Sequence, residues 1–146
     1  MLLPNFYMEN QMLNLKKIDH IAIATDNLKK SIKFFKYLGF KCEKIEVLVN
    51  RGIKIALINI GHVHLELISP LCDNSEISHF LNKKGPGLHH IAFETTNILS
   101  DMRNLQICGL NLISNQTQKG AFNTRVNFIH PKNSEKILVE LVEKQF

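Results

Sequence analysis

The sequence predicts an α+β fold built from two tandem βαβββ modules. The first observation behind this prediction is an internal repeat, because residues 18–28 (IDHIAIATDNL) align without a gap on residues 88–98 (LHHIAFETTNI), 70 positions later. Five of the eleven aligned residues are identical. The second observation is that Gly39 and Gly109 keep the same offset, and that HLELIS (64–69) is echoed by LVELVE (138–143). A half of this kind cannot bury its sheet alone, so the two copies are expected to pack together.

The first copy contains the pattern of a strand, a helix and three further strands. Residues 17–24 alternate apolar and polar side chains and carry β-branched isoleucines, which predicts a strand. Asp26 or Asn27 can cap the following helix, which Gly39 ends. Three strands are expected at about 41–50, 53–60 and 63–69, with Gly52 and Gly61 in the turns between them.

The second copy predicts the same order of elements. A strand is expected at 88–95, a helix at 97–107, and three strands near 110–115, 123–129 and 136–143. The connection between the copies carries one helical turn at 77–82. These ranges define an N-terminal arm at 1–15 and one domain at 16–146, with module one at 17–70, a linker at 71–86 and module two at 87–143. Because sheets twist, each half is curved, and pairing the two curved sheets encloses a cavity.

Composition predicts a protein of the cytoplasm that binds neither nucleic acid nor a membrane. The chain has 146 residues, 45% of them apolar, and no run approaching the roughly 18 consecutive apolar residues of a membrane span. Residues 1–15 lack the basic start of a signal peptide. The net charge of +5 is not accompanied by an aromatic-basic RNA motif or a helix-turn-helix signature. Three cysteines without CxxC spacing, Cys42, Cys72 and Cys108, suggest reduced thiols.

The lysines concentrate in the first repeat, where they admit two interpretations. They can form a solvated helix face, or they can attract an anionic substrate such as a phosphorylated coenzyme.

Each copy carries a histidine early and a glutamate late, which predicts a metal site. If the first and last strands of a module are neighbours, His20 can meet Glu66 and His90 can meet Glu140. The pseudo-twofold axis of the repeat then brings both pairs to one point in a metal-containing cavity. Imidazole and carboxylate ligands suit one borderline divalent ion such as Co, Ni, Zn or Mn. His89 is expected to point to the opposite face of its strand, as a packing residue or as a neighbour of the ligands.

Several segments resemble a known family. DHIAIA, the helix ending YLGF, HLELISPL, KGPGLHHIAFET, VNFIHPK and ILVELVE are similar, in this order, to motifs of the vicinal oxygen chelate (glyoxalase/bleomycin resistance/dioxygenase) superfamily, and within it of the methylmalonyl-CoA epimerases. The resemblance covers about residues 18–143. It implies the same four metal ligands, an acyl-CoA or thioester-type substrate, and a homodimer.

The resemblance also implies a reaction: epimerisation of methylmalonyl-CoA by α-proton abstraction through a metal-stabilised enolate. Two bases on opposite faces of the substrate are needed, and our hypothesis assigns these roles to Glu140, labile on the metal, and Glu66. Some epimerases place a catalytic glutamate in the strand after the turn glycine. Here that strand, at 53–60, contains no carboxylate.

Five residues are candidates for binding the substrate. Arg51 and Lys54 follow the first module's second strand and suit an anionic substrate. Arg125 and Asn127 share one face of the strand at 123–129, where they line the cavity or cover the outside. Lys132 in the HPK segment either belongs to a turn or contacts a phosphate group.

Two other functions remain open. A glyoxalase I-type lactoylglutathione lyase would run the same proton transfer on a glutathione hemithioacetal. A non-catalytic small-molecule binding or resistance protein would use the cavity alone, but such a protein has no need of two histidines and two glutamates. HHIAFE and HPK favour the epimerase over the lyase by resemblance.

Overall fold

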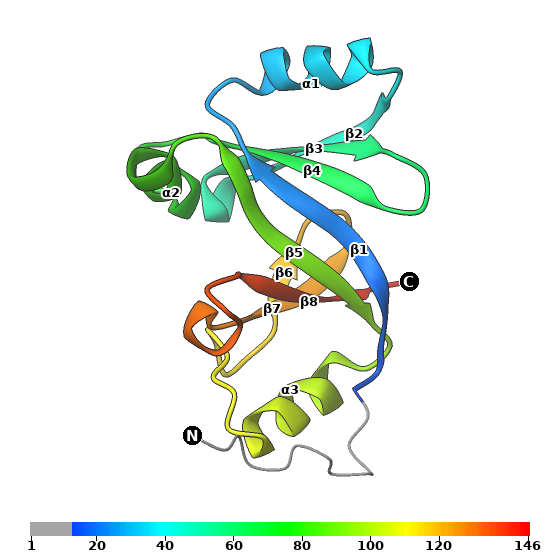
Figure 1. Cartoon of the computed structure of the whole chain (residues 1–146), viewed down its shortest axis with the longest axis vertical. Coiled ribbons are helices and arrows are strands. Elements are labelled where there is room, and N and C mark those ends of the chain that lie inside the picture. The colour runs from blue at the N-terminus through cyan, green and yellow to red at the C-terminus, as the bar shows by residue number, and fades with distance from the viewer. Residues whose placement is uncertain (1–12) are drawn as a thin grey trace.

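A single mixed sheet of eight strands forms the body of the molecule in the computed structural model, which describes residues 13–146 (Figure 1). The elements of module one are β1 (Leu15–Ala24), α1 (Leu28–Tyr37), β2 (Lys41–Leu48), β3 (Ile53–Asn59) and β4 (His64–Pro70). The connection contains α2 (Glu76–Lys84). The elements of module two are β5 (Gly87–Thr95), α3 (Ile98–Ile107), β6 (Gln118–Gly120), β7 (Thr124–Ile129) and β8 (Val139–Lys144). Single 3-10 turns lie at Val49–Arg51 and Pro131–Asn133.

The strand order confirms the predicted two-module α+β fold. The order is β2-β3-β4-β1-β5-β8-β7-β6, in which β1 pairs antiparallel with β5 at the centre. The first and last strands of each module are parallel neighbours, β1 beside β4 and β5 beside β8. The modules therefore join edge to edge into one continuous sheet that curls into a half-barrel (Figure 1).

Two helices cover the outer face of this curved sheet, one for each module. Figure 1 shows α1 above β2, β3 and β4, and α3 on the far side of β7 and β8. The predicted cap Asn27 accepts a hydrogen bond from the Lys30 amide at 3.0 Å, and Asn97 does the same for the Ser100 amide at 3.1 Å. Leu28, Ile32 and Phe35 of α1 pack on the outer cluster that contains Leu65 and Leu67. The repeat in the sequence thus corresponds to a repeated unit of structure, in which an asparagine-capped helix packs on the strands of its module.

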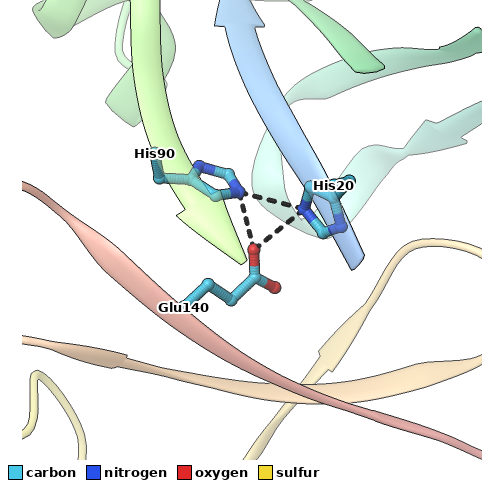
Figure 2. A group of neighbouring side chains, drawn as sticks. All are labelled: His20, His90 and Glu140. Atoms are coloured by element: carbon cyan, nitrogen blue, oxygen red, sulfur yellow. Dashed lines mark hydrogen bonds and ion pairs between the residues drawn. The ribbon is translucent and has the colours of Figure 1, made fainter. Parts of the chain in front are cut away.

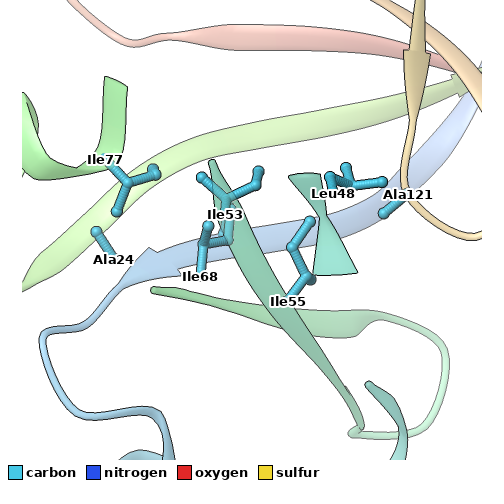
Figure 3. Close-up of a cluster of buried hydrophobic side chains, with 8 residues drawn as sticks. Ala24, Leu48, Ile53, Ile55, Ile68, Ile77 and Ala121 are labelled. Carbon is cyan, nitrogen blue, oxygen red and sulfur yellow. The ribbon is translucent and has the colours of Figure 1, made fainter. Parts of the chain in front are cut away.

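The inner face of the sheet carries its own apolar cluster. Figure 3 shows how residues from β1, β3, β4 and α2 point toward one another there. Leu48, at the end of β2, and Ala121, just after β6, belong to this same cluster. The two edges of the sheet therefore contribute to one hydrophobic core, which fixes the curvature of the sheet around a cavity.

The predicted strand at 110–115 is wrong. This segment has only an isolated bridge between Leu112 and Ile129, and the outermost strand of module two is the three-residue β6. The Asn127 side-chain amide donates to the Ser114 carbonyl at 2.8 Å, so a side chain takes the position that a ladder bond would occupy. The helical turn expected at 77–82 is longer than predicted, because Ser75 caps the nine-residue α2.

The structure describes the last three residues, 13–15, of the predicted N-terminal arm. Residues 1–12 of this prediction lie outside the described residues. Leu13 and Leu15 pack against the cluster under α3, and the backbone and side-chain amides of Asn14 both donate to Asp101 at 2.8 Å. The packed part of the chain therefore begins before residue 16.

Two expectations from composition concern membranes and disulfides. None of the helices between residues 13 and 146 combines the length and the apolar character needed to cross a membrane. None of the three cysteines, all within the described range, forms a disulfide.

Candidate metal centre

Three of the four predicted metal ligands meet in the middle of the sheet. His20 comes from β1, His90 from β5 and Glu140 from β8, and Figure 2 shows their side chains pointing toward one another. The two Nε2 atoms lie 3.2 Å apart, and Glu140 Oε2 lies 3.2 Å from His20 Nε2 and 2.6 Å from His90 Nε2. The exposed fractions of these residues are 3%, 6% and 5%. The strand register produces this meeting, because Ala22 lies opposite His90 and Ala92 pairs with both His20 and Glu140.

Glu66, the fourth predicted ligand, lies beside this group. It is buried on β4, next to β1, and its Oε2 is 3.4 Å from His20 Nε2. The described residues whose ligand atoms all lie within 4.8 Å of one another are His20, His90 and Glu140, so Glu66 is outside the tightest group. The two modules thus contribute unequally to the centre.

The donor set fits a borderline divalent ion. Ligand atoms about 2.0–2.2 Å from one ion lie about 3.0–3.4 Å from one another at adjacent coordination positions. The contacts of 3.2 Å between the two Nε2 atoms and between His20 Nε2 and Glu140 Oε2 fall in this range. Two imidazole nitrogens with carboxylate oxygens, and no thiolate, suit Co, Ni, Zn or Mn. These residues could therefore hold one such ion.

The pKa values of His20, Glu66 and Glu140 are displaced in different directions. Although burial opposes it, the negative charge of Glu66 and hydrogen bonds with Asp19 and Glu140 raise the pKa of His20 well above its ordinary value. Burial and the charge of Glu140 raise the pKa of Glu66, although His20 opposes them. For Glu140, burial is outweighed by the charges and hydrogen bonds of His90 and His20, which hold its pKa far below the ordinary range. Glu140 is thus the more acidic of the two carboxyl groups, and Glu66 takes up a proton more easily.

Sequence reasoning missed Asp19 and predicted the wrong face for His89, although the predicted position of His89 as a neighbour of the ligands is observed. Asp19 Oδ2 lies 2.8 Å from His20 Nδ1, and His89 Nδ1 lies 2.8 Å from His90 Nδ1, so the His89 side chain reaches toward the ligand instead of away from it. Burial and the charge of His90 lower the pKa of His89 to about 4. The available signal was their position, since each directly precedes a predicted ligand in the repeat.

His20, Glu66 and Glu140 line a cleft of about 380 Å³ and form its charged floor. Its apolar wall consists of Ile53, Ile55, Leu57, Ile68 and Ile77. The turn at 121–124 contributes a second side, and three cations, Lys44, Arg51 and Lys144, lie along its lining. The cleft thus offers an anionic ligand positive charges along its walls, above the buried groups His20, Glu66 and Glu140.

Of the five predicted substrate-binding residues, Arg51 lines this cleft. Its guanidinium donates to Glu76 Oε1 from Nη2 at 2.8 Å and from Nε at 3.2 Å, which places it near the start of α2. The described residues that line the cleft do not include the other four candidates, Lys54, Arg125, Asn127 and Lys132.

Strand alternation explains the positions of Arg125 and Asn127. Thr124 lines the cleft and Phe128 packs its ring against His90, so the even-numbered residues of β7 face inward. Arg125 pairs with Glu143, and Asn127 contacts Ser114 and Met102 beneath α3. Of the two alternatives for this face, covering the outside is the one observed.

Comparisons with known proteins agree with this geometry. A family model described as Glyoxalase/Bleomycin resistance protein/Dioxygenase superfamily matches residues 19–128. The mitochondrial methylmalonyl-CoA epimerase of Homo sapiens is 35% identical over 130 residues, covering 88% of this chain and 74% of the human protein. A crystal structure of methylmalonyl-CoA epimerase from Mycobacterium tuberculosis has a TM-score of 0.88 at 31% identity, with 93% of each chain covered. A variant of the Streptomyces coelicolor epimerase in complex with 2-nitronate-propionyl-CoA has a TM-score of 0.87 at 31% identity, covering 90% of this chain and 99% of the other.

Proposed function

Since this chain belongs to the glyoxalase/bleomycin resistance protein/dioxygenase superfamily, we propose that it is a metal-dependent epimerase of methylmalonyl-CoA. The reaction removes the α-proton of the acyl group and returns it to the opposite face. The observation that carries this proposal is the convergence of His20, His90 and Glu140 beside a cleft that His20 and Glu140 line and whose wall is apolar. Such a site combines a cation-binding set with exclusion of water, which an enolate requires.

His20, His90 and Glu140 would hold the ion, with Glu66 beside them as a fourth ligand. A divalent cation bound there supplies positive charge next to the oxygen on which the enolate charge develops. The donor set favours Co, Ni, Zn or Mn, and we propose that the bound ion is one of these four. The residues around the centre have the remaining tasks of holding the acyl group and moving its proton.

Glu66 and Glu140 are the proposed pair of proton carriers. Both are buried carboxyl groups that line the cleft, and they project from β4 and β8 on the two sides of the β1–β5 pair. Their pKa values are displaced in opposite directions, which is typical of groups that divide acid and base roles. Epimerisation needs such a pair, because the proton leaves one face of the carbon and returns to the other. β3 supplies isoleucine and leucine to the cleft, so the acid/base pair comes from other strands.

Arg51 is proposed to attract the substrate's negative charge. It lines the cleft together with Lys44 and Lys144, and an acyl-CoA carries phosphates as well as the free carboxylate of its malonyl group. The ion pair with Glu76 holds the guanidinium near the start of α2.

The test is loss of the α-proton signal in D₂O, followed by proton NMR. Cobalt-loaded protein is mixed with methylmalonyl-CoA, a metal-stripped sample serves as the control, and spontaneous exchange is subtracted. We expect rapid washout that depends on the metal. Washout no faster than background, with cobalt shown to be bound, would contradict the proposal and direct the same assay to a glutathione hemithioacetal, the substrate of the lyase alternative.

A homodimer is the proposed assembly. On α1 the apolar side chains of Phe34, Tyr37 and Leu38 are 56%, 75% and 56% exposed, which leaves a surface suited to a second subunit. Light scattering coupled to size exclusion should give twice the chain mass of 16.8 kDa. A mass of one chain at micromolar concentration would contradict this assembly.

The cytoplasm is the proposed compartment. Reduced cysteines support it, since disulfides persist mainly in oxidising compartments. Fractionation of cells that express the tagged chain should recover it with cytoplasmic markers.

A further inference from the structure

The central ladder between β1 and β5 has three register shifts, and two of them are bulges that lie beside the metal centre. Ile18 pairs with Phe93 and His20 with Ala92, so Asp19 is an extra residue of β1 without a partner in the ladder. Ala22 pairs with His90 and Ile23 with Leu88, so His89 is the corresponding extra residue of β5. A bulge re-aims the side chains around it. Each bulge lies immediately before a histidine of the metal centre, at equivalent positions of the repeat.

The side chains of Asp19 and His89 each contact Nδ1 of the histidine that follows. Nε2 of His20 and Nε2 of His90 face the centre, 3.2 Å from each other. The Nδ1 atoms point away from it, one toward Asp19 Oδ2 and one toward His89 Nδ1, each at 2.8 Å. The bulges therefore give each imidazole a hydrogen-bond partner on the side opposite to the proposed ion.

These contacts assign the tautomers of the centre. An Nε2 atom that binds a cation carries no proton, so Nδ1 must carry it and donate. His20 Nδ1–H then donates to the carboxylate of Asp19, and His90 Nδ1–H donates to Nδ1 of His89. To accept this bond, His89 must be the neutral tautomer with its own proton on Nε2.

The two partners differ in charge, although the repeat makes them equivalent. Asp19 is a carboxylate whose second oxygen lies 3.3 Å from Lys144 Nζ, within a charged group at the end of the sheet. His89 packs edge-on against the Phe80 ring, with 4.8 Å between ring centroids. A carboxylate increases the basicity of the imidazole that donates to it more than a neutral imidazole does. His20 is thus the stronger electron donor of two otherwise matched ligands.

We propose that Asp19 and His89 are paired positioning residues, each delivered by its bulge to fix the tautomer and ring orientation of the following histidine. This inference rests on the proposed metal centre. It extends that centre by two residues, and it predicts that each partner controls its own histidine and not the other.

The experiment uses the cobalt-loaded full chain and proton NMR. Nδ1–H protons of histidines bound to Co²⁺ give strongly shifted, exchangeable signals, so the wild type should show one for His20 and one for His90. His89→Phe removes the acceptor and retains an aromatic ring against Phe80, whereas His89→Gln can still accept through its side-chain oxygen. Asp19→Leu and Asp19→Asn form the matched pair for His20. Circular dichroism of each metal-free variant verifies that it is folded.

In His89→Phe we expect one shifted signal to disappear or to exchange with solvent much faster. In Asp19→Leu we expect the same change in the other signal. Cobalt affinity should fall about 10–100-fold in both, and much less in the glutamine and asparagine variants. Two unchanged signals with unchanged affinity in folded His89→Phe and Asp19→Leu would overturn the pairing while leaving the metal centre intact. A wild type that binds no cobalt, or binds it without such signals, would overturn the centre and the pairing together.

Discussion

At the scale of single residues, Glu66 and Glu140 show how one repeat yields two different roles. Both are buried in the last strand of a module. Glu140 contacts both imidazoles, at 2.6 and 3.2 Å, whereas Glu66 approaches His20 at 3.4 Å. The charges and hydrogen bonds of His90 and His20 stabilise the anion of Glu140, and burial destabilises the anion of Glu66. The account therefore gives Glu140 the larger part in holding the ion.

Glu140→Gln should weaken metal binding far more than Glu66→Gln does. Glutamine preserves the shape of each side chain but removes its charge, and Glu140 is the carboxylate closest to both ligand nitrogens. Because loss of an indirect partner alone costs about 10–100-fold, loss of this direct ligand should exceed about 100-fold. Titration against a coloured chelator measures both affinities. Equal losses in the two variants would contradict the unequal roles.

Metal binding at pH 7 should release about one proton, from His20. Its pKa lies well above 6.5 in the metal-free protein, so at pH 7 the imidazole is protonated and the ion must displace that proton. Affinity should accordingly rise with pH and level off above the raised pKa. Calorimetry in two buffers of different ionisation enthalpy counts the protons released. His62→Gln, an exposed histidine outside the cleft, is the control that should match the wild type.

At the scale of elements, each module begins with the same strand, cap and helix. The caps Asn27 and Asn97 are identical in the sequence and bond alike, each to an amide three residues later. The helix that follows Asn97 covers the cluster of Met102, Leu105 and Leu141, so its start determines how the outer face of module two is packed.

Asn97→Ala should lower the free energy of unfolding by about 1 kcal/mol, because the first turn of α3 loses an acceptor for an amide. The cobalt affinity should stay unchanged, since the cap lies outside the residues that line the cleft. Urea denaturation measures the stability, and Asn97→Asp, which retains an acceptor, is the matched control. A loss of equal size in the aspartate variant would contradict the capping role.

The sequence predicted the elements better than their local irregularities. Alternation and the repeat identified β1, β5 and the capped helices, and they paired each histidine with a glutamate on a neighbouring strand. Period-2 reasoning placed His89 on the wrong face, because a bulge shifts the alternation without any required residue type. It also placed a strand at 110–115, where pairing with β7 is limited to an isolated bridge and the Asn127 side chain bonds to Ser114. Both errors depend on contacts between distant segments, which a pattern within one segment does not contain.

At the scale of the whole molecule, the curvature of the sheet makes the cleft. β2 and β6 are the two edge strands, yet the Phe122 amide, next to β6, donates to Glu46 Oε2 on β2 at 2.6 Å. Phe122 and Asn123 have φ values of 54° and 58°, which is unfavourable for residues with a Cβ. The turn that closes the cleft is therefore held by a bond between the two modules.

Glu46→Ala should loosen this closure. Loss of a charge-assisted hydrogen bond is expected to lower the free energy of unfolding by about 1–2 kcal/mol. It should also raise KM more than it lowers kcat, because Glu46 touches the turn and not the centre. Steady-state kinetics and denaturation measure both effects, and Glu46→Gln, which keeps an oxygen acceptor, should retain most of the wild-type behaviour. A fall in kcat at constant KM would contradict a closing role.

The central claim concerns two carboxyl groups, Glu66 and Glu140, on either side of a two-histidine metal centre. One removes the α-proton from one face of the substrate, and the other returns a proton to the opposite face. The most direct measurement follows deuterium uptake from D₂O into each separate epimer of methylmalonyl-CoA by Glu66→Gln loaded with cobalt. The account predicts that one epimer exchanges its α-hydrogen and keeps its configuration, because Glu140 still serves its own face. Interconversion of the epimers at the wild-type rate by this variant would contradict the account.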